Sequence, residues 1–182
     1  MKKIFLAILL MVMSMAINAG VLTNAQITTV RAAMVADTNL TALLAPAQPD
    51  VTAISNYLNA ASTVDAWNDS IDSRTLFEAM DITLYDAVTA GKRDSWSLLL
   101  QFAPVDMKRA QYRKAIVDVW GTVSAPAILT ACLRKATNLE RYLANAAVTT
   151  QGVSGVRLTF SGSIPVNEVT GLIFNDNGTR AI

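Results

Sequence analysis

The chain has 182 residues, a formal net charge of +1 and a hydrophobic content of 52%, which is enough length and apolar material for one folded domain. It has no histidine, which excludes Ser-His-Asp and Cys-His mechanisms and removes the commonest metal ligand. The near-neutral charge lacks the basic excess of a phosphate-backbone-binding protein, and the single cysteine, Cys132, excludes an internal disulfide.

Residues 1–20 have the pattern of an export signal. Lys2 and Lys3 precede an apolar run over residues 4–17, and the small residues that follow suit a signal peptidase. A helix over that run spans about 21 Å, less than the roughly 30 Å hydrocarbon core, so a cleaved signal is favoured over a permanent anchor.

Three helices are predicted next. The sequence TNAQ at 23–26 is a capping box, which begins a helix that ends near Asp37. A short helix around residues 40–44 stops at Pro46, and a third helix begins at Pro49-Asp50.

The following segment alternates connections with helices. Residues 59–70 are polar and rich in Ala and Ser, which predicts a connection that Trp67 pins to the core. Asp72 and Asp81 each precede an apolar run and are expected to begin helices. The second run continues past Gly91, either as one kinked helix or as two.

The longest helix is predicted between residues 124 and 143. A helix that begins at Asp106 is expected to end at Gly121, where a left-handed residue is favoured. Ser124-Ala125-Pro126 then starts an amphipathic stretch with apolar positions one, three and four residues apart, at Ile128, Leu129, Cys132, Leu133, Ala136, Leu139, Tyr142 and Leu143. We expect this helix to be central.

After Ala147 the pattern changes to that of strands. Val156, Leu158 and Phe160 alternate with polar residues, Ile173-Phe174 suits a second strand, and Asn177-Gly178 a turn. The predicted fold is therefore mainly α, a single helical bundle-like domain with a small C-terminal β element. Its parts are the signal-like segment 1–20, a helical domain over 21–147, and a β-containing segment over 148–182 packed on the same domain.

Carboxylates are the abundant acid/base candidates, and one stretch holds Asp65, Asp69, Asp72, Glu78, Asp81 and Asp86. Two such groups can hydrolyse a glycoside, but no lysozyme-like spacing of Glu, Asp and Thr is present, and Asp commonly caps helices. The stretch lacks EF-hand spacing, and residues 152–155 read as a turn rather than a phosphate-binding loop. We therefore assign no catalytic, cofactor-binding or metal-ligating residue and expect no cofactor.

A cluster of six cations is the second candidate site, formed by Lys92, Arg93, Lys108, Arg109, Arg113 and Lys114. Neighbouring acids favour salt bridges over nucleic-acid binding, although Trp96 and Tyr112 are interleaved with the cations. All three tryptophans, at 67, 96 and 120, are expected to anchor the core rather than stack on bases. Cys132 is expected to be a buried structural thiol.

Several short stretches carry a family resemblance. They are Leu22-Thr23 with Ala32-Ala33 and Asp37, Trp67 with Ser70-Ile71 and Arg74, KRDSW at 92–96, IVDVWG at 116–121, Lys135-Ala136-Thr137 with Leu139-Glu140, and Leu158-Thr159-Phe160 with Gly162 and residues 166–169. Together they resemble a family of small, poorly characterised tailed-phage proteins encoded among virion structural genes. The resemblance implies a mostly helical protein with a virion or assembly role, and no catalytic residue. Members of that family begin near the first helix, so Met15 is an alternative start.

These observations lead to two expected functions. The first is a non-enzymatic phage or prophage structural or assembly protein that contacts other virion proteins or copies of itself, located in the virion if Met15 is the start. The alternative is an exported binding protein of the periplasm or envelope, including a prophage-encoded one. A carboxylate hydrolase ranks last, and neither nucleic-acid binding nor a stable membrane span after signal cleavage is expected.

Overall fold

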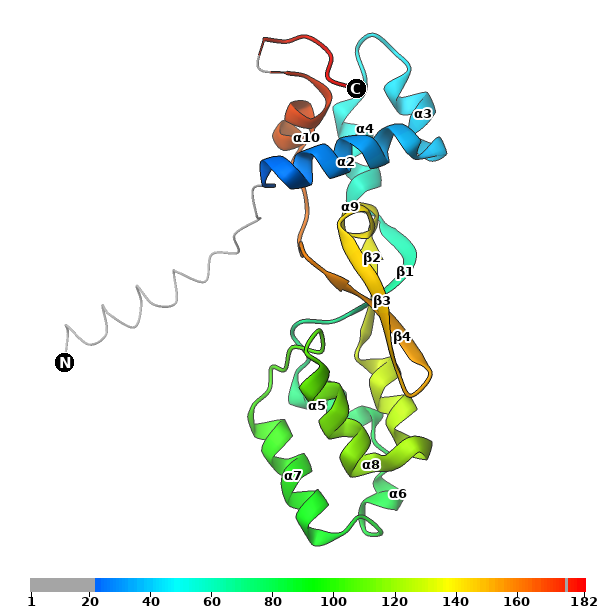
Figure 1. Ribbon diagram of the computed structural model, residues 1–182, viewed down its shortest axis with the longest axis vertical. Helices are drawn as coiled ribbons and strands as arrows, with labels where there is room; N and C mark the ends of the chain where they lie inside the picture. Colours follow the sequence, from blue (N-terminus) through cyan, green and yellow to red (C-terminus); the bar gives the residue numbers. More distant parts are fainter. Residues whose placement is uncertain (1–21, 176) are drawn as a thin grey trace, which may run out of the picture.

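The computed structural model describes residues 22–175 and 177–182, so the predicted export signal lies outside the described residues. The protein is rod-shaped, with a helical lobe at each end and a sheet between the lobes (Figure 1). The upper lobe contains α2 (Asn24–Ala36), α3 (Thr38–Leu44), α4 (Val51–Asn59) and α10 (Val166–Ile173). The lower lobe contains α5 (Ser73–Ala79), α6 (Ile82–Tyr85), α7 (Ala90–Gln101) and α8 (Ala110–Ala131). Between them lie β1 (Ala61–Trp67), β2 (Leu133–Thr137), β3 (Ala144–Thr150) and β4 (Val153–Leu158), with the short helix α9 (Asn138–Tyr142) joining β2 to β3.

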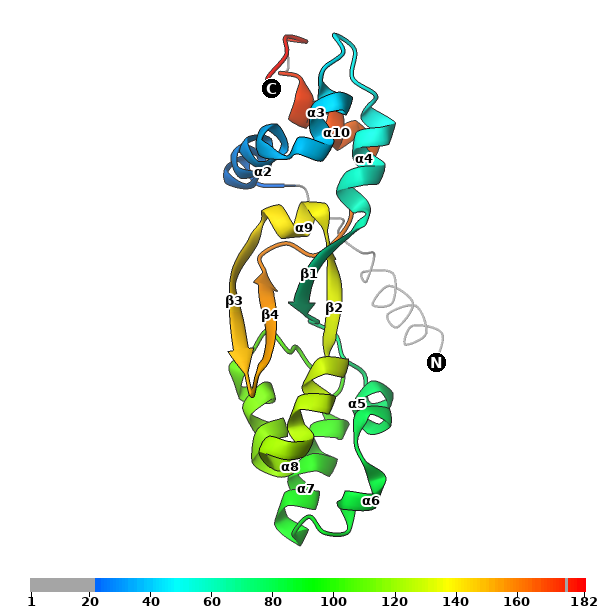
Figure 2. The same cartoon turned by 90° about the vertical axis from the view of Figure 1, so that its right-hand side faces the viewer.

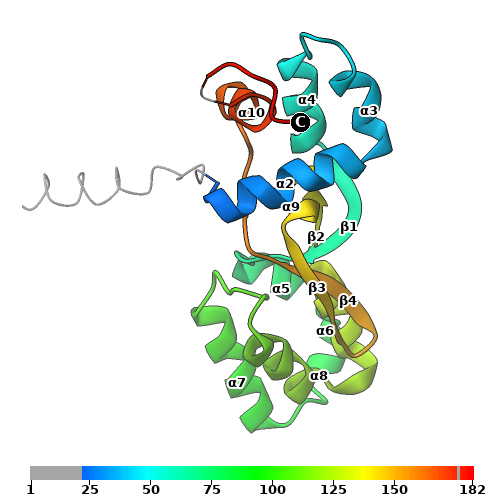
Figure 3. The ribbon, with the colours of Figure 1, turned by 45° about the horizontal axis from the view of Figure 1, so that its top comes forward.

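The upper lobe buries the apolar faces of its helices against one another. Its first helix begins as predicted, because the Thr23 hydroxyl accepts from the Gln26 amide while the Gln26 side chain accepts from the Thr23 amide. Val30 and Met34 of α2 are fully buried in one cluster with α4, α9 and α10, which gather at this end of the sheet (Figure 3). Arg180 donates to backbone carbonyls at the end of α3, so the C-terminal segment packs in the same lobe.

The sheet has the strand order β2-β1-β4-β3 and mixes both pairing directions. β1 is antiparallel to β2 and parallel to β4, and β3 is antiparallel to β4. Gln151 and Gly152 turn the β3–β4 hairpin with φ of 49° and 79°, as a tight hairpin turn requires. The turn predicted over residues 152–155 is therefore correct only at Gly152, because residues 153–155 belong to β4. The lobes lie at the two ends of the sheet rather than across its faces (Figure 2).

The lower lobe is built around two tryptophans. Trp96 and Trp120 pack edge to face with ring centroids 5.3 Å apart. Asp72 and Asp81 cap α5 and α6 as predicted, and α6 and α7 are separate helices. Gly121 has a φ of 69° and breaks the regular geometry of α8, at the position where the sequence predicts a left-handed residue.

The prediction of a mainly α, bundle-like fold is wrong. The protein is mixed α/β with a four-stranded sheet, although helices predominate. The predicted connection over residues 59–70 contains β1, and the predicted helix over 124–143 is replaced after Cys132 by β2 and α9.

Both errors have a physical explanation. Apolar spacing between residues 128 and 143 suits a helix, but the same side chains are buried in three shorter elements, so tertiary pairing overrides the local pattern. A second capping box, between Thr137 and Glu140, begins α9 and marks the break in the sequence itself. β1 owes its strand to Thr63, Val64 and Trp67, whose side chains favour extended backbone.

The C-terminal segment departs from prediction in a smaller way. The expected strand over Ile173-Phe174 is wrong, because Ile173 ends α10 and Phe174 forms only an isolated bridge with Arg180. The strand predicted around Val156 and Leu158 is confirmed as β4. Over the described residues, no helix is both long and apolar enough to cross a membrane.

Candidate functional site

The six carboxylates of the acidic stretch are distributed over β1, the loop after it and the ends of α5 and α6, and each has a structural partner. Asp72 and Asp81 accept from backbone amides at the starts of α5 and α6. The other four are in ion pairs, which are Asp65 with Lys135, Asp69 with Lys108, Glu78 with Arg74, and Asp86 with Arg93. Asp72 and Asp81 are therefore helix caps, as predicted, and the other four carboxylates are members of ion pairs. Within the described ranges, no three Cys, Asp or Glu side chains come together as a possible metal site.

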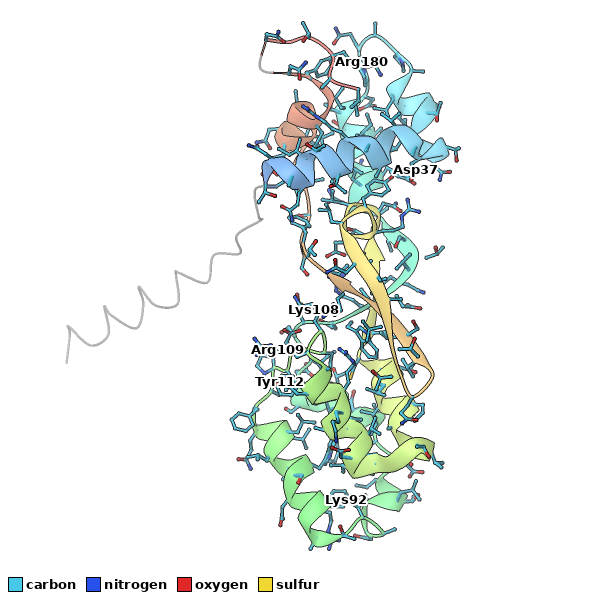
Figure 4. All side chains as sticks on the ribbon, in the orientation of Figure 1. Asp37, Lys92, Lys108, Arg109, Tyr112 and Arg180 are labelled. Carbon is cyan, nitrogen blue, oxygen red and sulfur yellow. The ribbon has the colours of Figure 1, made fainter. Side chains whose placement is uncertain are left out.

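The six-cation cluster is not one patch. Figure 4 shows Lys92 near the far end of the lower lobe, apart from Lys108, Arg109 and Tyr112. Four of the six cations make ion pairs, which are Arg93 with Asp86, Lys108 with Asp69, Arg109 with Asp106, and Lys114 with Asp118. Salt bridging therefore accounts for most of this charge, as the sequence predicts.

Arg113 differs from the other five cations, because its side chain is buried and holds the β3–β4 hairpin to the lower lobe. Its Nε donates to the Thr150 hydroxyl at 3.1 Å, a second nitrogen donates to the Met107 carbonyl, and the guanidinium lies 4.9 Å from the centre of the Trp67 ring. Desolvation and the nearby Arg157 lower the pKa of Arg113. Nothing in the sequence around Arg113 predicts that its side chain is buried.

The Trp67 side chain extends from β1 across β4 to β3, the strand at the far edge of the sheet. Its Nε1 donates to the Val148 carbonyl of β3 at 3.1 Å, and its ring passes over Gly155 of the intervening β4. The strand order requires this crossing, because β4 lies between β1 and β3. Trp67 is fully buried, so its predicted anchoring role is confirmed, and the hydrogen bond fixes the position of β3.

The other predicted core residues are also placed as expected. Trp96 and Trp120 are buried in the lower lobe. Cys132 is fully buried at the end of α8, and burial raises the pKa of its thiol to about 12. A thiol in that state is a structural group rather than a nucleophile at neutral pH.

The most connected polar cluster centres on Asp37. The sequence predicts only that the first helix ends near this residue. One carboxylate oxygen accepts from Tyr142 at 2.6 Å, from Arg141 at 2.7 Å and from Tyr57 at 2.9 Å. The other accepts from the Asn39 amide at 2.9 Å. Burial raises the pKa of Asp37, but these hydrogen bonds outweigh it and hold the pKa well below its ordinary value. The cluster joins α2, α3, α4 and α9, so its function is to hold the upper lobe together.

A second buried carboxylate, Glu140, was also missed. Arg134 of β2 donates two hydrogen bonds of 2.7 Å to the Glu140 carboxylate, and the backbone amides of Thr137 and Gly162 also donate to it. Burial raises the pKa of Glu140, while Arg134 and these amides lower it to a net value below the ordinary one. Both carboxylates are saturated by internal donors, which leaves little capacity to bind or activate a substrate.

Exposed apolar side chains are the remaining feature, and they are concentrated on the lower lobe. Of the eight large apolar side chains exposed among the described residues, six lie there, which are Phe77, Ile82, Leu84, Leu98, Phe102 and Val123. Phe77 and Leu100 line a shallow hollow between α5 and α7 with a volume of about 470 Å³. We call these six side chains the apolar surface of the lower lobe.

Comparison with family models, with curated proteins and with solved structures finds no match in any of the three.

Proposed function

We propose that this protein is a non-enzymatic structural or assembly protein of a phage or prophage that works through contacts with other virion proteins or with copies of itself. The apolar surface of the lower lobe carries this proposal. Large exposed apolar patches often mark interfaces, and six of the eight large exposed apolar side chains among the described residues lie on this lobe.

This surface can contribute part of the free energy of association, which must also offset a cost of about 4–15 kcal/mol for lost translational and rotational freedom. Phe102 is 64% exposed and Leu98 is 52% exposed. Burying a whole Phe or Leu side chain is worth about 1.5–3 kcal/mol, so burying the exposed part of each is worth about 1 kcal/mol. The six side chains together offer on the order of 5 kcal/mol before the costs of association.

The polar groups support contact rather than turnover. The described carboxylates with the lowest exposure, Asp37 and Glu140, already accept hydrogen bonds from several protein donors. The chain contains no histidine to act as a general base near neutral pH. The phage assignment itself rests on the resemblance of the sequence stretches described above.

Mass spectrometry of purified phage particles tests this function. We expect the wild-type chain in particles and several-fold less of a Phe102→Ser variant. Val35→Ser is the matched control, because Val35 is 62% exposed but lies on α2 in the upper lobe. Absence of the wild-type chain from particles, or equal incorporation of both variants, would contradict the proposal.

The alternative is an exported envelope or periplasmic binding protein, and the signal-like residues 1–20 favour it. Identification of the N-terminal peptide in separated cell fractions distinguishes the two. A chain that begins between residues 16 and 21 in the periplasm supports export, whereas a chain that begins at Met15 in particles supports the virion role.

A further inference from the structure

The outer edge of β3 pairs with no other strand among the described residues, and a β-bulge protects only the first part of the strand. β3 is the last strand of the sheet and pairs only with β4, so its outward backbone groups face away from the sheet (Figure 2). Asn145, Ala146, Ala147 and Thr149 are exposed along it. Natural proteins usually block such an edge with charge, proline or a covering element, because free amides and carbonyls recruit another strand.

Charge distinguishes the two edges of this sheet. Residues 142–156 contain no charged residue and no proline. The opposite edge, β2, carries Arg134 and Lys135, both held in ion pairs. The β3 edge therefore presents fewer charges to an added strand than the β2 edge does.

The β3 edge is also rigid enough to act as a template. Trp67 holds the Val148 carbonyl, Arg113 holds the Thr150 hydroxyl, and Thr159 donates to the Leu143 carbonyl at the start of the strand. A register shift between Ala144 and Ala147 interrupts the first part of β3, so regular pairing is available over residues 147–150.

We propose that the β3 edge binds the β3 edge of a second copy of this chain in antiparallel orientation, which joins two four-stranded sheets into one. A second copy fits because a two-fold axis places residues near the axis beside their own equivalents, and an uncharged edge does this without repulsion between like charges. Pairing over residues 147–150 supplies about four backbone hydrogen bonds. It also places the lower lobe of each rod beside the upper lobe of the other, which adds contact area.

Two cations near β3 are in no ion pair among the described residues. Arg113 is buried and donates to the Thr150 hydroxyl, so it does not stand on the exposed edge. Arg157 of β4 lies opposite the irregular part of β3. With a rise of about 3.4 Å per residue and strands about 4.8 Å apart, the two Arg157 residues of the dimer are roughly 20–25 Å from each other. Salt screens charges at that separation.

A cysteine scan of the full-length protein tests the pairing. Cys132 is buried, so it can remain in place. We expect single cysteines at 146, 147, 148 and 149 to give a disulfide-linked dimer at one position or two adjacent ones, where the two-fold axis crosses the strand. Ser154→Cys on β4 and Lys135→Cys on β2 are controls that should stay monomeric. Equal cross-linking at all positions, or none at any position of β3, would overturn the proposal.

Sedimentation velocity on charge variants gives a second readout without new covalent bonds. Thr149→Lys should raise the dimer dissociation constant at least tenfold, because it places like charges across the axis. Ser154→Lys, on the residue paired with Thr149 in β4, should change it less than threefold. A wild-type chain that stays monomeric at 200 μM, or one that pairs only when another protein is added, would rule out the second copy.

A second copy as partner presupposes the contact-based function proposed above, but the two can fail separately. A monomeric chain that still enters particles through Phe102 would refute only the β3 pairing. A dimeric chain that is absent from particles would refute only the virion role.

Discussion

Gly155 is the residue at which the crossing of the sheet by Trp67 can be tested most sharply. A Cβ at this position would lie 2.7 Å from the Leu133 Cδ2 atom and 3.2 Å from both the Trp67 Cδ1 atom and the Trp67 backbone nitrogen. The Leu133 side chain can rotate away, but the Trp67 backbone can move only if β1 and β4 separate. Gly155→Ala is therefore an overpacking substitution within the sheet.

The expected cost follows from this geometry. Overpacking a well-packed site costs about 1–3 kcal/mol, and the loss of glycine freedom in the unfolded chain returns about 0.4–1 kcal/mol. A net destabilisation of about 1.5 kcal/mol remains. With a urea m-value of about 2 kcal/mol/M, the unfolding midpoint should fall by roughly 0.8 M. Tryptophan fluorescence reports the transition, and the emission of Trp67 should also change in the folded state.

Gly171→Ala is the matched control. Gly171 lies inside α10, and nothing lies within 4 Å of an added Cβ there. Alanine is favoured over glycine in a helix by about 0.5–1 kcal/mol, so the midpoint should rise. A Gly155→Ala protein as stable as wild type, with unchanged emission, would refute the tight crossing of Trp67 over β4.

Three further substitutions or reactions test the buried polar groups. Asp37→Asn should cost about 3 kcal/mol at pH 7 by urea unfolding, because Tyr57, Tyr142 and Arg141 lose a charged acceptor. The pKa of Asp37 is lower in the folded than in the unfolded protein, so its stabilising contribution is complete above about pH 5 and should shrink as the pH falls below about 4. If the stability difference between wild type and Asp37→Asn stayed constant down to pH 3, the lowered pKa of Asp37 would be contradicted. Glu140→Gln should destabilise by about 3 kcal/mol, whereas the exposed pair member Glu78→Gln should cost less than about 0.5 kcal/mol; equal costs would disprove the buried pair. Cys132 should react with iodoacetamide at pH 8 about a thousandfold more slowly than in urea, and rapid labelling of the folded protein would show that the thiol is accessible.

The sequence predicts local features of this fold better than its long-range pairing. The capping box at Thr23, the caps at Asp72 and Asp81, and the left-handed residue at Gly121 are all present. Each depends on groups a few residues apart, which a single sequence contains.

Strand pairing is a different case, because the partners of β1 lie far away in the chain. Ala66 pairs with Arg134 on one side and with Val156 on the other. Nothing between residues 59 and 70 encodes those distances, and the apolar spacing after residue 128 fits a helix equally well. The break at Thr137 was detectable from its capping box, whereas the mixed strand order was not.

The candidate surfaces were still harder to predict. Arg113 and Glu140 are charged residues with no sequence feature that marks them as buried, and their burial depends on partners in β3 and β2. The exposure of Phe77 and Phe102 is also invisible in the sequence, because apolar residues on short helices are usually buried. The absence of charge over residues 142–156, by contrast, can be read from the sequence. It gains meaning only when the structure places β3 at the edge of the sheet.

Cross-linking mass spectrometry on intact phage particles tests the contact-based function most directly. Lys92 lines the same hollow as Leu84, and Lys114 lies on α8, so both can report contacts of the lower lobe. We predict cross-links from these lysines to a different virion protein or to another copy of the chain. Links confined to a single chain, or particles that contain none of the protein, would contradict it.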